Sequence, residues 1–376
     1  MKIAIISPWA VAATSVGGTE RFIIDLAESL QQQGNTVDVY MFDGTPHLSH
    51  HISYLSIGLL GEGISVNEYT LRAQLGDFSL AKTYTALATA IESRIDMTEY
   101  DAIHCNTQLL LRAWQNKRRI FTIHTNPFEF KQAWGEASYE TMLDIAKEEA
   151  PRVTFTAPSR YYADLFSDKI GTEVACIPHA IDPSRLASKK SKNALTAHYA
   201  LDASKLHILL PSRLEPVQKQ PWLLFNALQY ISLSLCKKIE IISSGVDPQY
   251  QTFKNLYSQQ ANTRSINVHF VKFDDMSDAY AMADIVVLPS QSESFGYAAL
   301  EALTLGIPTL LNNIPTFHEI AAGNETARFF KTDARDLAQL LETCLNKRCA
   351  RINPNSEWMA RYSVDSWVKE YEELFV

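Results

Sequence analysis

The sequence alternates twice between short continuous apolar runs and longer segments with helical periodicity. The apolar runs cover residues 2–7, 37–42, 102–105, 120–124, 153–157 and 174–177, and then 207–211, 239–243, 268–273, 285–289 and 309–311. Short Val-, Ile- and Phe-rich runs are typical of strands that helices cover on both faces. Strands that alternate with helices predict an α/β fold built from parallel, doubly wound sheets.

The alternation is interrupted once, near residue 184. Residues 185–192 hold four lysines or arginines, a charge run typical of a linker or a solvated helix face. A chain of 376 residues is long enough for two domains of ordinary size. We therefore expect domains at 1–183 and 184–355. Residues 356–376 are predicted to form an amphipathic helix whose aromatic stripe serves packing.

Composition limits the function classes. The formal net charge of -8 argues against an extended nucleic-acid surface, so phosphate binding would need a local basic cluster. The five cysteines show no C-x-x-C spacing and suit the reduced thiols of a cytoplasmic protein. No apolar run approaches the ~20 residues that a spanning helix needs. We expect a soluble, cytoplasmic protein without a signal peptide.

Ligands of doubly wound sheets bind at the carboxyl ends of strands, so the loops after strands are the places to search. Gly17 and Gly18 stand between the first strand and a helix predicted over residues 20–33. A glycine pair lets the backbone approach an anion at a helix N-terminus. The pair is neither G-x-G-x-x-G nor a Walker A loop, and a loop that only turns the chain would look the same.

Two cations follow the first strand of the second domain. Arg213 and Lys219 lie in the loop before a helix predicted over residues 222–230. Arginine binds phosphate oxygens in a bidentate manner and lysine adds a point charge. Together they would offset the charge of a diphosphate without a metal. Two solvated surface cations would give the same pattern.

A third loop carries the stretch SESFGYAALE, with Glu293 before a helix predicted over 297–305 and Glu301 inside it. With helical rise throughout, the two acids would be roughly 12 Å apart and within about 80° of each other around the helix. Between them, the amides of residues 294–296 are expected to face an anion. Carboxylates accept hydrogen bonds from diols, so the arrangement fits a nucleotide sugar. A dipole-favoured acid and a solvated helix glutamate are the alternative.

Taken together, these motifs resemble the retaining GT-B glycosyltransferases of family GT4 over nearly the whole chain. The resemblance rests on Gly17, Gly18 and Glu20, and on YDAIHCN at 100–106, HTN at 124–126, PSRYYADLF at 158–166, IPHAID at 177–182, SRLEPVQK at 212–219 and the block at 282–310. It implies two Rossmann-like domains that face each other across a cleft which closes on donor binding. The first would bind the acceptor and the second the donor, with the terminal helix 356–376 packed back on the first.

The resemblance also implies roles for individual residues. Glu293 and His124 would be the catalytic residues, with Glu293 facing the hexose and His124 on the acceptor side. The donor-binding set would be Gly18, Arg213, Lys219, Glu293, Ser294, Phe295, Gly296 and Glu301. In this set the cations bind the diphosphate, residues 294–296 contact phosphate and sugar, and Glu301 holds the ribose. Gly18 would close over the phosphates from the first domain.

The implied activity is retaining transfer of a hexosyl unit, such as glucose or N-acetylglucosamine, from a UDP-sugar to an acceptor hydroxyl. The acceptor would be a sugar, lipid-linked or small-molecule, in glycan, glycolipid or glycoside biosynthesis. No cofactor and no essential metal are expected, because a front-face mechanism uses the leaving phosphate as base. The basic segment 111–119 is short, which favours at most weak peripheral contact with the inner face of the membrane.

The chain departs from the family pattern at Gln220, where the family often has glycine, and at His179-Ala180, where Asn-Gly is common. Other readings remain open. A non-catalytic nucleotide-sugar-binding subunit or a GT-B nucleotide-sugar epimerase would share most of these residues. A phosphorylase would be longer and would need a pyridoxal-phosphate lysine, and a dehydrogenase would need G-x-G-x-x-G after a strand.

Overall fold

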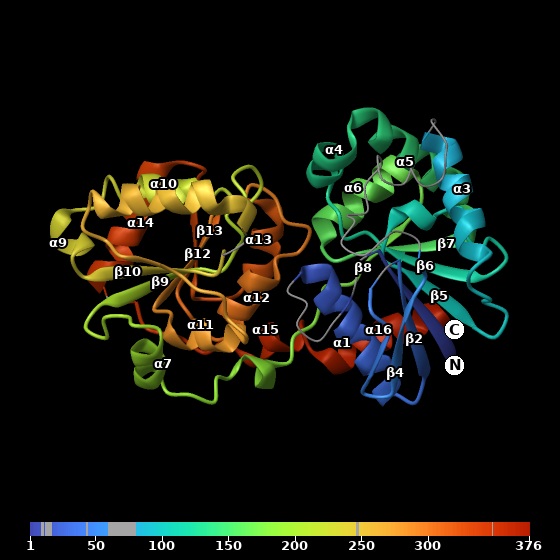
Figure 1. The fold of residues 1–376 in the computed structure, drawn as a ribbon, viewed down its shortest axis with the longest axis horizontal. Helices are drawn as coiled ribbons and strands as arrows, with labels where there is room; N and C mark the ends of the chain where they lie inside the picture. The colour runs from blue at the N-terminus through green and yellow to red at the C-terminus, as the bar shows by residue number, and fades with distance from the viewer. Residues whose placement is uncertain (9–10, 12–16, 43, 59–79, 246–247, 348) are drawn as a thin grey trace. The chain divides into compact units, whose positions relative to one another are not determined.

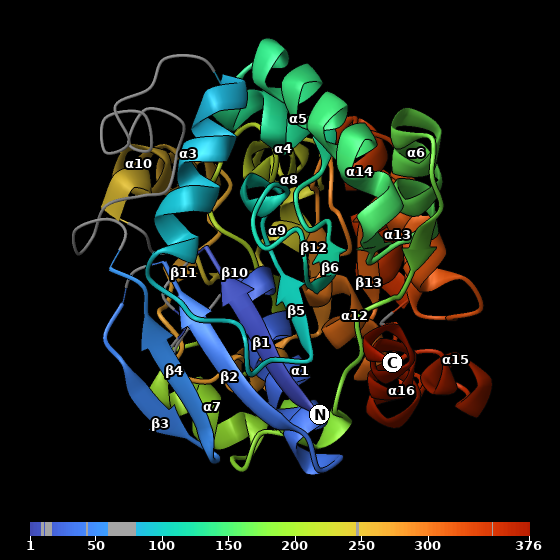
Figure 2. The same cartoon turned by 90° about the vertical axis from the view of Figure 1, so that its right-hand side faces the viewer.

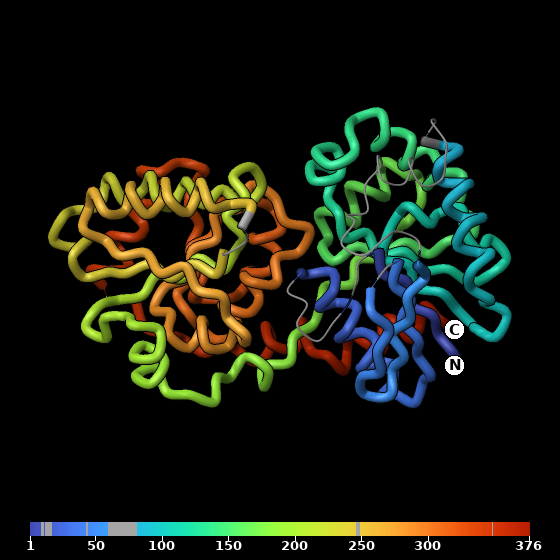
Figure 3. The backbone as a smooth tube through the Cα atoms, in the orientation of Figure 1, coloured from blue at the N-terminus to red at the C-terminus, as the bar shows by residue number. Residues whose placement is uncertain are grey.

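The computed structural model describes residues 1–8, 11, 17–42, 44–58, 80–245, 248–347 and 349–376. The chain forms two compact units (Figure 1). Unit 1 comprises Met1–His179 and Val364–Val376, and unit 2 comprises Ala180–Ser363. The chain therefore leaves unit 1 after His179 and returns to it after Ser363 (Figure 3).

Unit 1 is built on an eight-stranded sheet of order β3-β4-β2-β1-β5-β6-β7-β8. Among the strands in the described ranges of this unit, only the β3–β4 pair is antiparallel, and Figure 2 shows β4, β2, β1 and β5 in sequence across the sheet. The strands are β1 (Lys2–Ser7), β2 (Thr36–Met41), β3 (His47–Ser49), β4 (Ile52–Ser56), β5 (Ala102–Cys105), β6 (Arg118–Thr122), β7 (Val153–Ala157) and β8 (Val174–Cys176).

Helices cover both faces of this sheet. One face packs an apolar core under α3, α5 and α6, and the other contacts α1 and α16. The helices are α1 (Gly18–Gln32), α3 (Leu80–Glu92), α4 (Pro127–Trp134), α5 (Glu136–Glu149), α6 (Arg160–Ile170) and α16 (Val364–Phe375). Short 3-10 turns span Gln108–Leu110 and Ala150–Arg152. Because both faces are buried, the central strands carry apolar residues at successive positions rather than at alternate ones.

Unit 2 is an all-parallel, six-stranded sheet of order β11-β10-β9-β12-β13-β14. The strands are β9 (Leu206–Leu210), β10 (Ile239–Ser243), β11 (Val268–Phe270), β12 (Ile285–Leu288), β13 (Thr309–Asn312) and β14 (Ala327–Phe330). The helices are α7 (Lys192–His198), α8 (Pro221–Ala227), α9 (Leu233–Cys236), α10 (Gln251–Asn262), α11 (Met276–Met282), α12 (Tyr297–Thr304), α13 (Pro315–Ala321), α14 (Ala334–Lys347) and α15 (Ser356–Ala360). Further 3-10 turns span Pro183–Leu186 and Pro248–Tyr250.

The C-terminal segment is divided between the units. Residues 356–376 were expected to form one helix, but α15 ends at Ala360 and α16 begins at Val364. Trp358 of α15 is buried in a core of unit 2, where its indole N–H donates to the Ile320 carbonyl at 2.9 Å. Tyr371 of α16 packs in unit 1, 5.7 Å from the ring of Phe22. The aromatic stripe therefore serves two separate cores.

The predicted α/β class and parallel sheets are confirmed, and the ends of the predicted strands differ from the observed ones by at most three residues. Three strands were not predicted: β3, β4 and β14. The β3–β4 turn uses His50 and His51, both with positive φ, where a hairpin turn ordinarily shows Asn-Gly. Among the described residues, no helix combines the length and apolarity needed to cross a membrane.

Candidate functional site

Two loops of unit 2 begin at neighbouring strands where the strand order reverses. β9 and β12 pair directly, β10 and β11 extend the sheet on one side, and β13 and β14 extend it on the other. The β9–α8 loop (residues 211–220) and the β12–α12 loop (residues 289–296) therefore start at adjacent carboxyl ends. This is the switch point at which doubly wound sheets bind ligands.

Hydrogen bonds hold the two loops together. The Gln291 amide donates to the Gln218 carbonyl at 2.7 Å, and Gln218 Nε2 donates to the Ser292 carbonyl at 3.2 Å. Gln220 Nε2 donates to Gln291 Oε1 at 3.0 Å. Both backbone and side-chain groups make these contacts, so the relative position of the loops is well defined.

Lys219 and Glu293 form an ion pair between the loops, with Nζ 2.8 Å from Oε1. Their side chains are 16% and 15% exposed, so solvent screens the pair less than an open surface pair. The sequence placed both residues near a ligand but gave no sign that they contact each other. The structure thus brings together the lysine that was expected to bind phosphate and the glutamate that was expected to face the sugar.

Glu215 organises the β9–α8 loop and was missed in the sequence. Its carboxylate accepts the backbone N–H groups of Val217, Gln218 and Lys219, at 2.9 Å for Val217 and 3.2 Å for Lys219. Trp222 Nε1 closes the same turn by donating to the Pro216 carbonyl at 3.0 Å. An acid directly before a proline, followed by a tight loop, is the signal that could have pointed to it.

Two backbone positions constrain the loops further. Gln220, at the position where glycine is common in the family, is left-handed with φ 46° and ψ 48°. Gly245, after β10, lies so close to the β9–α8 loop that a Cβ atom would be 2.8 Å from both the Ser212 carbonyl oxygen and Leu214 Cγ. Gln220 therefore adopts a left-handed backbone conformation that usually favours glycine.

Gly296 is the N-cap residue of α12 and lies between Glu293 and the helix. It has φ 108°, and a Cβ there would be 2.9 Å from Phe317 Cε1. Because α12 starts at Tyr297, the helical-rise estimate of 12 Å and 80° between the two glutamates does not apply. Phe295 is buried, which anchors this loop and leaves its amides at the helix N-terminus.

Glu301 lies in α12 beside a buried tyrosine. Tyr280 of α11 donates its hydroxyl to Glu301 Oε2 at 2.6 Å, and burial followed by the nearby carboxylate raises the pKa of Tyr280 well above its ordinary value. The phenol therefore stays protonated and acts as a donor to the carboxylate. This contact fixes one oxygen of the residue that the resemblance assigns to ribose.

The remaining predicted donor residues behave differently. Arg213 is exposed and makes no hydrogen bond or ion pair with any other described residue. The hydroxyls of Ser212, Ser290 and Ser292 are buried without a hydrogen-bond partner in the described parts of the chain. Ser294 sits partly exposed in the β12–α12 loop. Unit 2 thus contains polar groups near the switch point that its own side chains leave available.

Gly18 and His124 belong to unit 1. Gly18 is the exposed first residue of α1. His124 follows β6, is partly buried, and its Nε2 lies 2.8 Å from Asn106 Oδ1. The ring of Phe22 lies 4.7 Å from those of both His124 and His179. Burial lowers the pKa of His124 to about 3, so the imidazole is neutral at physiological pH.

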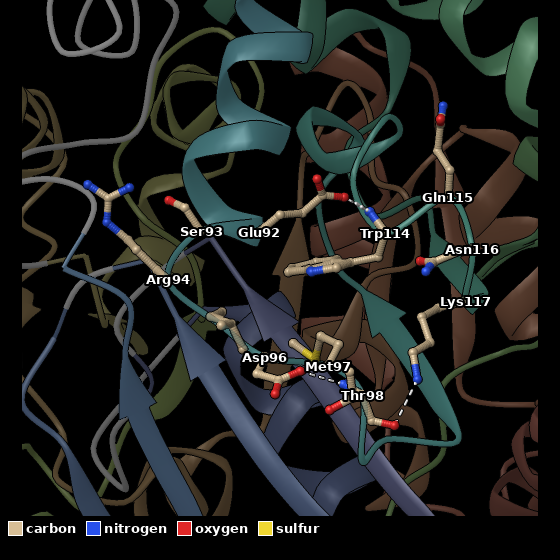
Figure 4. Close-up of a pocket in the computed structure, with 11 residues that line it drawn as sticks. Glu92, Ser93, Arg94, Asp96, Met97, Thr98, Trp114, Gln115, Asn116 and Lys117 are labelled. Atoms are coloured by element: carbon tan, nitrogen blue, oxygen red, sulfur yellow. Dashed lines mark hydrogen bonds between the residues drawn. The ribbon is translucent and has the colours of Figure 1, made fainter.

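A separate cavity of about 720 Å³ in unit 1 lies between the end of α3 and the β5–β6 connection (Figure 4). Its polar groups are largely bonded to one another. Lys117 Nζ donates to the Thr98 and Tyr100 carbonyls, and the Thr98 amide donates to Asp96 Oδ1. None of the predicted site residues lines it. In the described ranges, no group of three His, Cys, Asp or Glu side chains is placed to hold a metal ion.

Two family models match the chain. "Glycosyltransferase Family 4" matches residues 16–185, and "Glycosyl transferases group 1" matches residues 192–359. The two matches follow one another along the sequence and together cover most of both units.

Among curated relatives, the chain is 27% identical to the serotype-specific mannosyltransferase WbdA of Escherichia coli over 217 residues. That match covers 55% of this chain but only 25% of the relative, so the chain spans a small part of that protein's length. It is 21% identical to the N-acetyl-alpha-D-glucosaminyl L-malate synthase of Bacillus anthracis over 333 residues, which is 87% of this chain and 82% of the relative.

Among solved structures, the crystal structure of Anabaena HepE in complex with UDP and glucose has a TM-score of 0.72 to this chain. The alignment covers 99% of this chain and 98% of HepE at 18% identity, and so demonstrates a shared fold. The fold, the switch-point geometry and the two consecutive model matches agree. The chain belongs to family GT4 of the GT-B glycosyltransferases.

Proposed function

We propose that this chain transfers a hexosyl unit from a nucleoside-diphosphate sugar, UDP-linked, to an acceptor hydroxyl with retention of configuration and without a metal. Unit 2 would bind the donor and unit 1 the acceptor. The observation that carries the proposal is the Lys219–Glu293 pair at the β9/β12 switch point, beside the N-terminus of α12. A cation, the amides at a helix N-terminus and a carboxylate meet there, as a diphosphate joined to a polyol requires.

The donor would be held by complementary charges and hydrogen bonds. Arg213 is exposed and uncommitted among the described residues, so it can bind phosphate oxygens bidentately, while Lys219 supplies a second positive charge. The amides of residues 294–296 would complete the anion site. Glu301, fixed through one oxygen by Tyr280, would accept hydrogen bonds from the ribose hydroxyls.

In the chemical step, the bond between the anomeric carbon and the leaving diphosphate oxygen breaks while the acceptor oxygen bonds to the same face of that carbon. The leaving phosphate oxygen takes the acceptor proton, so no protein base is needed. Lys219, Arg213 and the α12 amides stabilise the negative charge that develops on the diphosphate. Glu293 would orient the hexose through its hydroxyls. Cations thereby do the work that a divalent metal does in other transferases.

The comparisons support a hexose as the transferred sugar. The name of WbdA describes a mannosyltransferase, that of the Bacillus relative an N-acetylglucosaminyl transfer product, and the HepE structure contains UDP and glucose. All three concern hexoses. We therefore propose glucose, N-acetylglucosamine or a similar hexose as the transferred sugar, and an acceptor in glycan, glycolipid or small-molecule glycoside synthesis.

The test is a thermal-shift and donor-hydrolysis screen with UDP-, GDP-, ADP- and dTDP-sugars in the presence of EDTA. A ligand that binds only the folded state raises the melting temperature by mass action. We expect a shift with the UDP-sugar and slow release of UDP, both unaffected by EDTA. NMR of a glycosylated product should show the anomeric configuration of the donor. A shift without release would instead support a non-catalytic binding subunit, and no shift would contradict the proposal.

A further inference from the structure

A chain of buried polar side chains in unit 1 begins at the carbonyl of Ile6 in β1. Asn106 follows β5, is 4% exposed, and donates through Nδ2 to that carbonyl at 3.1 Å. A carbonyl oxygen can only accept, so the amide nitrogen and not the amide oxygen must face Ile6. The backbone of β1 thus fixes which way the Asn106 amide is turned.

This orientation determines the protonation of His124. With Nδ2 facing Ile6, Oδ1 faces His124 Nε2 at 2.8 Å. An amide oxygen only accepts, so Nε2 must carry the hydrogen. A neutral imidazole has one N–H, and Nδ1 is therefore the unprotonated nitrogen. The Phe22 ring, edge-on at 4.7 Å and 63°, packs against the imidazole and restricts its rotation.

The Asn106 amide also determines which ring nitrogen of His104 carries the hydrogen. Asn106 Nδ2 also lies 3.3 Å from His104 Nδ1, which must accept. His104 Nε2 then donates to Thr122 Oγ1 at 2.9 Å. Thr122 Oγ1 in turn lies 2.7 Å from Thr156 Oγ1 and 3.3 Å from the Tyr371 hydroxyl, so its own hydrogen has an acceptor in either direction. All the donors along this chain point in compatible directions. No other assignment satisfies both the Ile6 carbonyl and the two imidazoles.

We infer that Asn106 is a positioning residue that holds His124 as the Nε2–H tautomer, so that His124 Nδ1 accepts a hydrogen bond from a substrate hydroxyl. The part that concerns substrate rests on the proposed function. An acceptor nitrogen at this place favours a sugar hydroxyl, which can donate, over a fluoro, methoxy or deoxy group, which cannot. His124 therefore contributes to selection of the hydroxyl pattern and does not supply a proton.

The tautomer can be measured without any substrate. The full-length protein, labelled with ¹⁵N in its histidine imidazoles, is examined by long-range ¹H–¹⁵N correlation at pH 7. The signal of His124 is assigned by its disappearance in His124→Gln. We expect a protonated Nε2 and an unprotonated Nδ1. A protonated Nδ1, or an equal mixture of the two tautomers, would overturn the inference.

Two substitutions of Asn106 test its role. In Asn106→Asp, a carboxylate oxygen still accepts from His124 Nε2–H but cannot donate to His104. We expect His124 to keep its hydrogen on Nε2 and His104 to acquire one on Nδ1. In Asn106→Leu, His124 should lose its tautomeric preference. If the tautomer of His104 is unchanged in Asn106→Asp, or the tautomer of His124 is unchanged in Asn106→Leu, Asn106 does not control the two tautomers. If Asn106→Leu does not fold, Asn106→Asp decides alone.

A kinetic measurement joins the tautomer to transfer. With the donor identified by the screen above, Asn106→Leu should lower kcat about tenfold while the KM for the donor changes less than twofold, since a tenfold change corresponds to one hydrogen bond of about 1.4 kcal/mol. Asn106→Asp should recover most of the rate, because it retains the bond to His124. Equal rates in wild type and Asn106→Leu would contradict the substrate part. Absence of transfer in the wild type would refute the proposed function and leave the tautomer result standing.

Discussion

Lys219 Nζ lies 2.8 Å from Glu293 Oε1, so a cation of one switch-point loop and a carboxylate of the other neutralise each other. Under the proposed function this pair is the resting arrangement of the donor site. A diphosphate would compete with Glu293 for Lys219, and the released carboxylate would then accept hydrogen bonds from the hexose. The pair thus keeps both residues ordered before the donor arrives, which lowers the cost of binding.

Glu293→Gln should lower kcat for transfer about 100-fold, a typical cost of misplacing the reacting sugar, because the neutral amide would orient the hexose hydroxyls less well than the carboxylate. It should leave UDP binding intact or tighter, since Lys219 loses its competing partner. Steady-state kinetics and calorimetry with UDP measure the two effects. Glu325→Gln, at an exposed position in the same unit, is the matched control and should change neither. Full transfer activity in Glu293→Gln would exclude Glu293 from the reaction.

Tyr280→Phe should lower the free energy of unfolding by about 1–2 kcal/mol, because it removes a buried donor from the Glu301 carboxylate. It should also raise the donor KM, since Glu301 would lose the contact that fixes it. Tyr257→Phe is the control: Tyr257 is equally buried in unit 2 but makes no hydroxyl hydrogen bond to another described residue. Urea unfolding of both variants checks the difference. Equal stabilities would mean that the Tyr280 bond contributes nothing net.

Substitutions of Gln220 test whether the left-handed backbone at this position, next to Lys219, costs stability. Gln220→Gly and Gln220→Ala both remove the side-chain bond to Gln291, but only glycine relieves the positive φ of 46°. The glycine variant should therefore be more stable than the alanine variant by about 1 kcal/mol. Thermal or urea unfolding of the pair measures this directly. A more stable alanine variant would show that the loop relaxes out of the left-handed region.

Acidification should destabilise unit 1. Burial lowers the pKa of His104 and His124 from 6.5 to about 3, so both are neutral when folded and take up a proton when unfolded below pH 6.5. The unfolded state then binds more protons, and stability falls between pH 6.5 and about 3 by up to about 1.4 kcal/mol per pH unit for each histidine. Denaturant unfolding at pH 7.5 and 5.5 measures the loss. The exposed His51→Gln variant should show the same loss, and a pH-independent midpoint would contradict the burial argument.

Much of the fold was predictable because it depends on local patterns. Runs such as residues 3–6 and 285–288 are apolar and buried throughout, a pattern typical of strands buried on both faces. The β3–β4 hairpin was missed because His50 and His51 form its turn in place of the usual turn residues. The break between α15 and α16 was missed because an aromatic stripe at helical spacing does not reveal that its members pack in two different units.

The sequence by itself determined two parallel α/β sheets and the loops in which polar residues concentrate, since strand periodicity and chain order depend on near neighbours. Only the tertiary structure decided which of those residues touch. Lys219 and Glu293 are 74 positions apart in the sequence, and Asn106 and Ile6, which share a hydrogen bond, are 100 positions apart. Such contacts arise from the pairing of β9 with β12 and of β1 with β5. Strand pairing is a property of the whole sheet, and no local stretch of sequence encodes it.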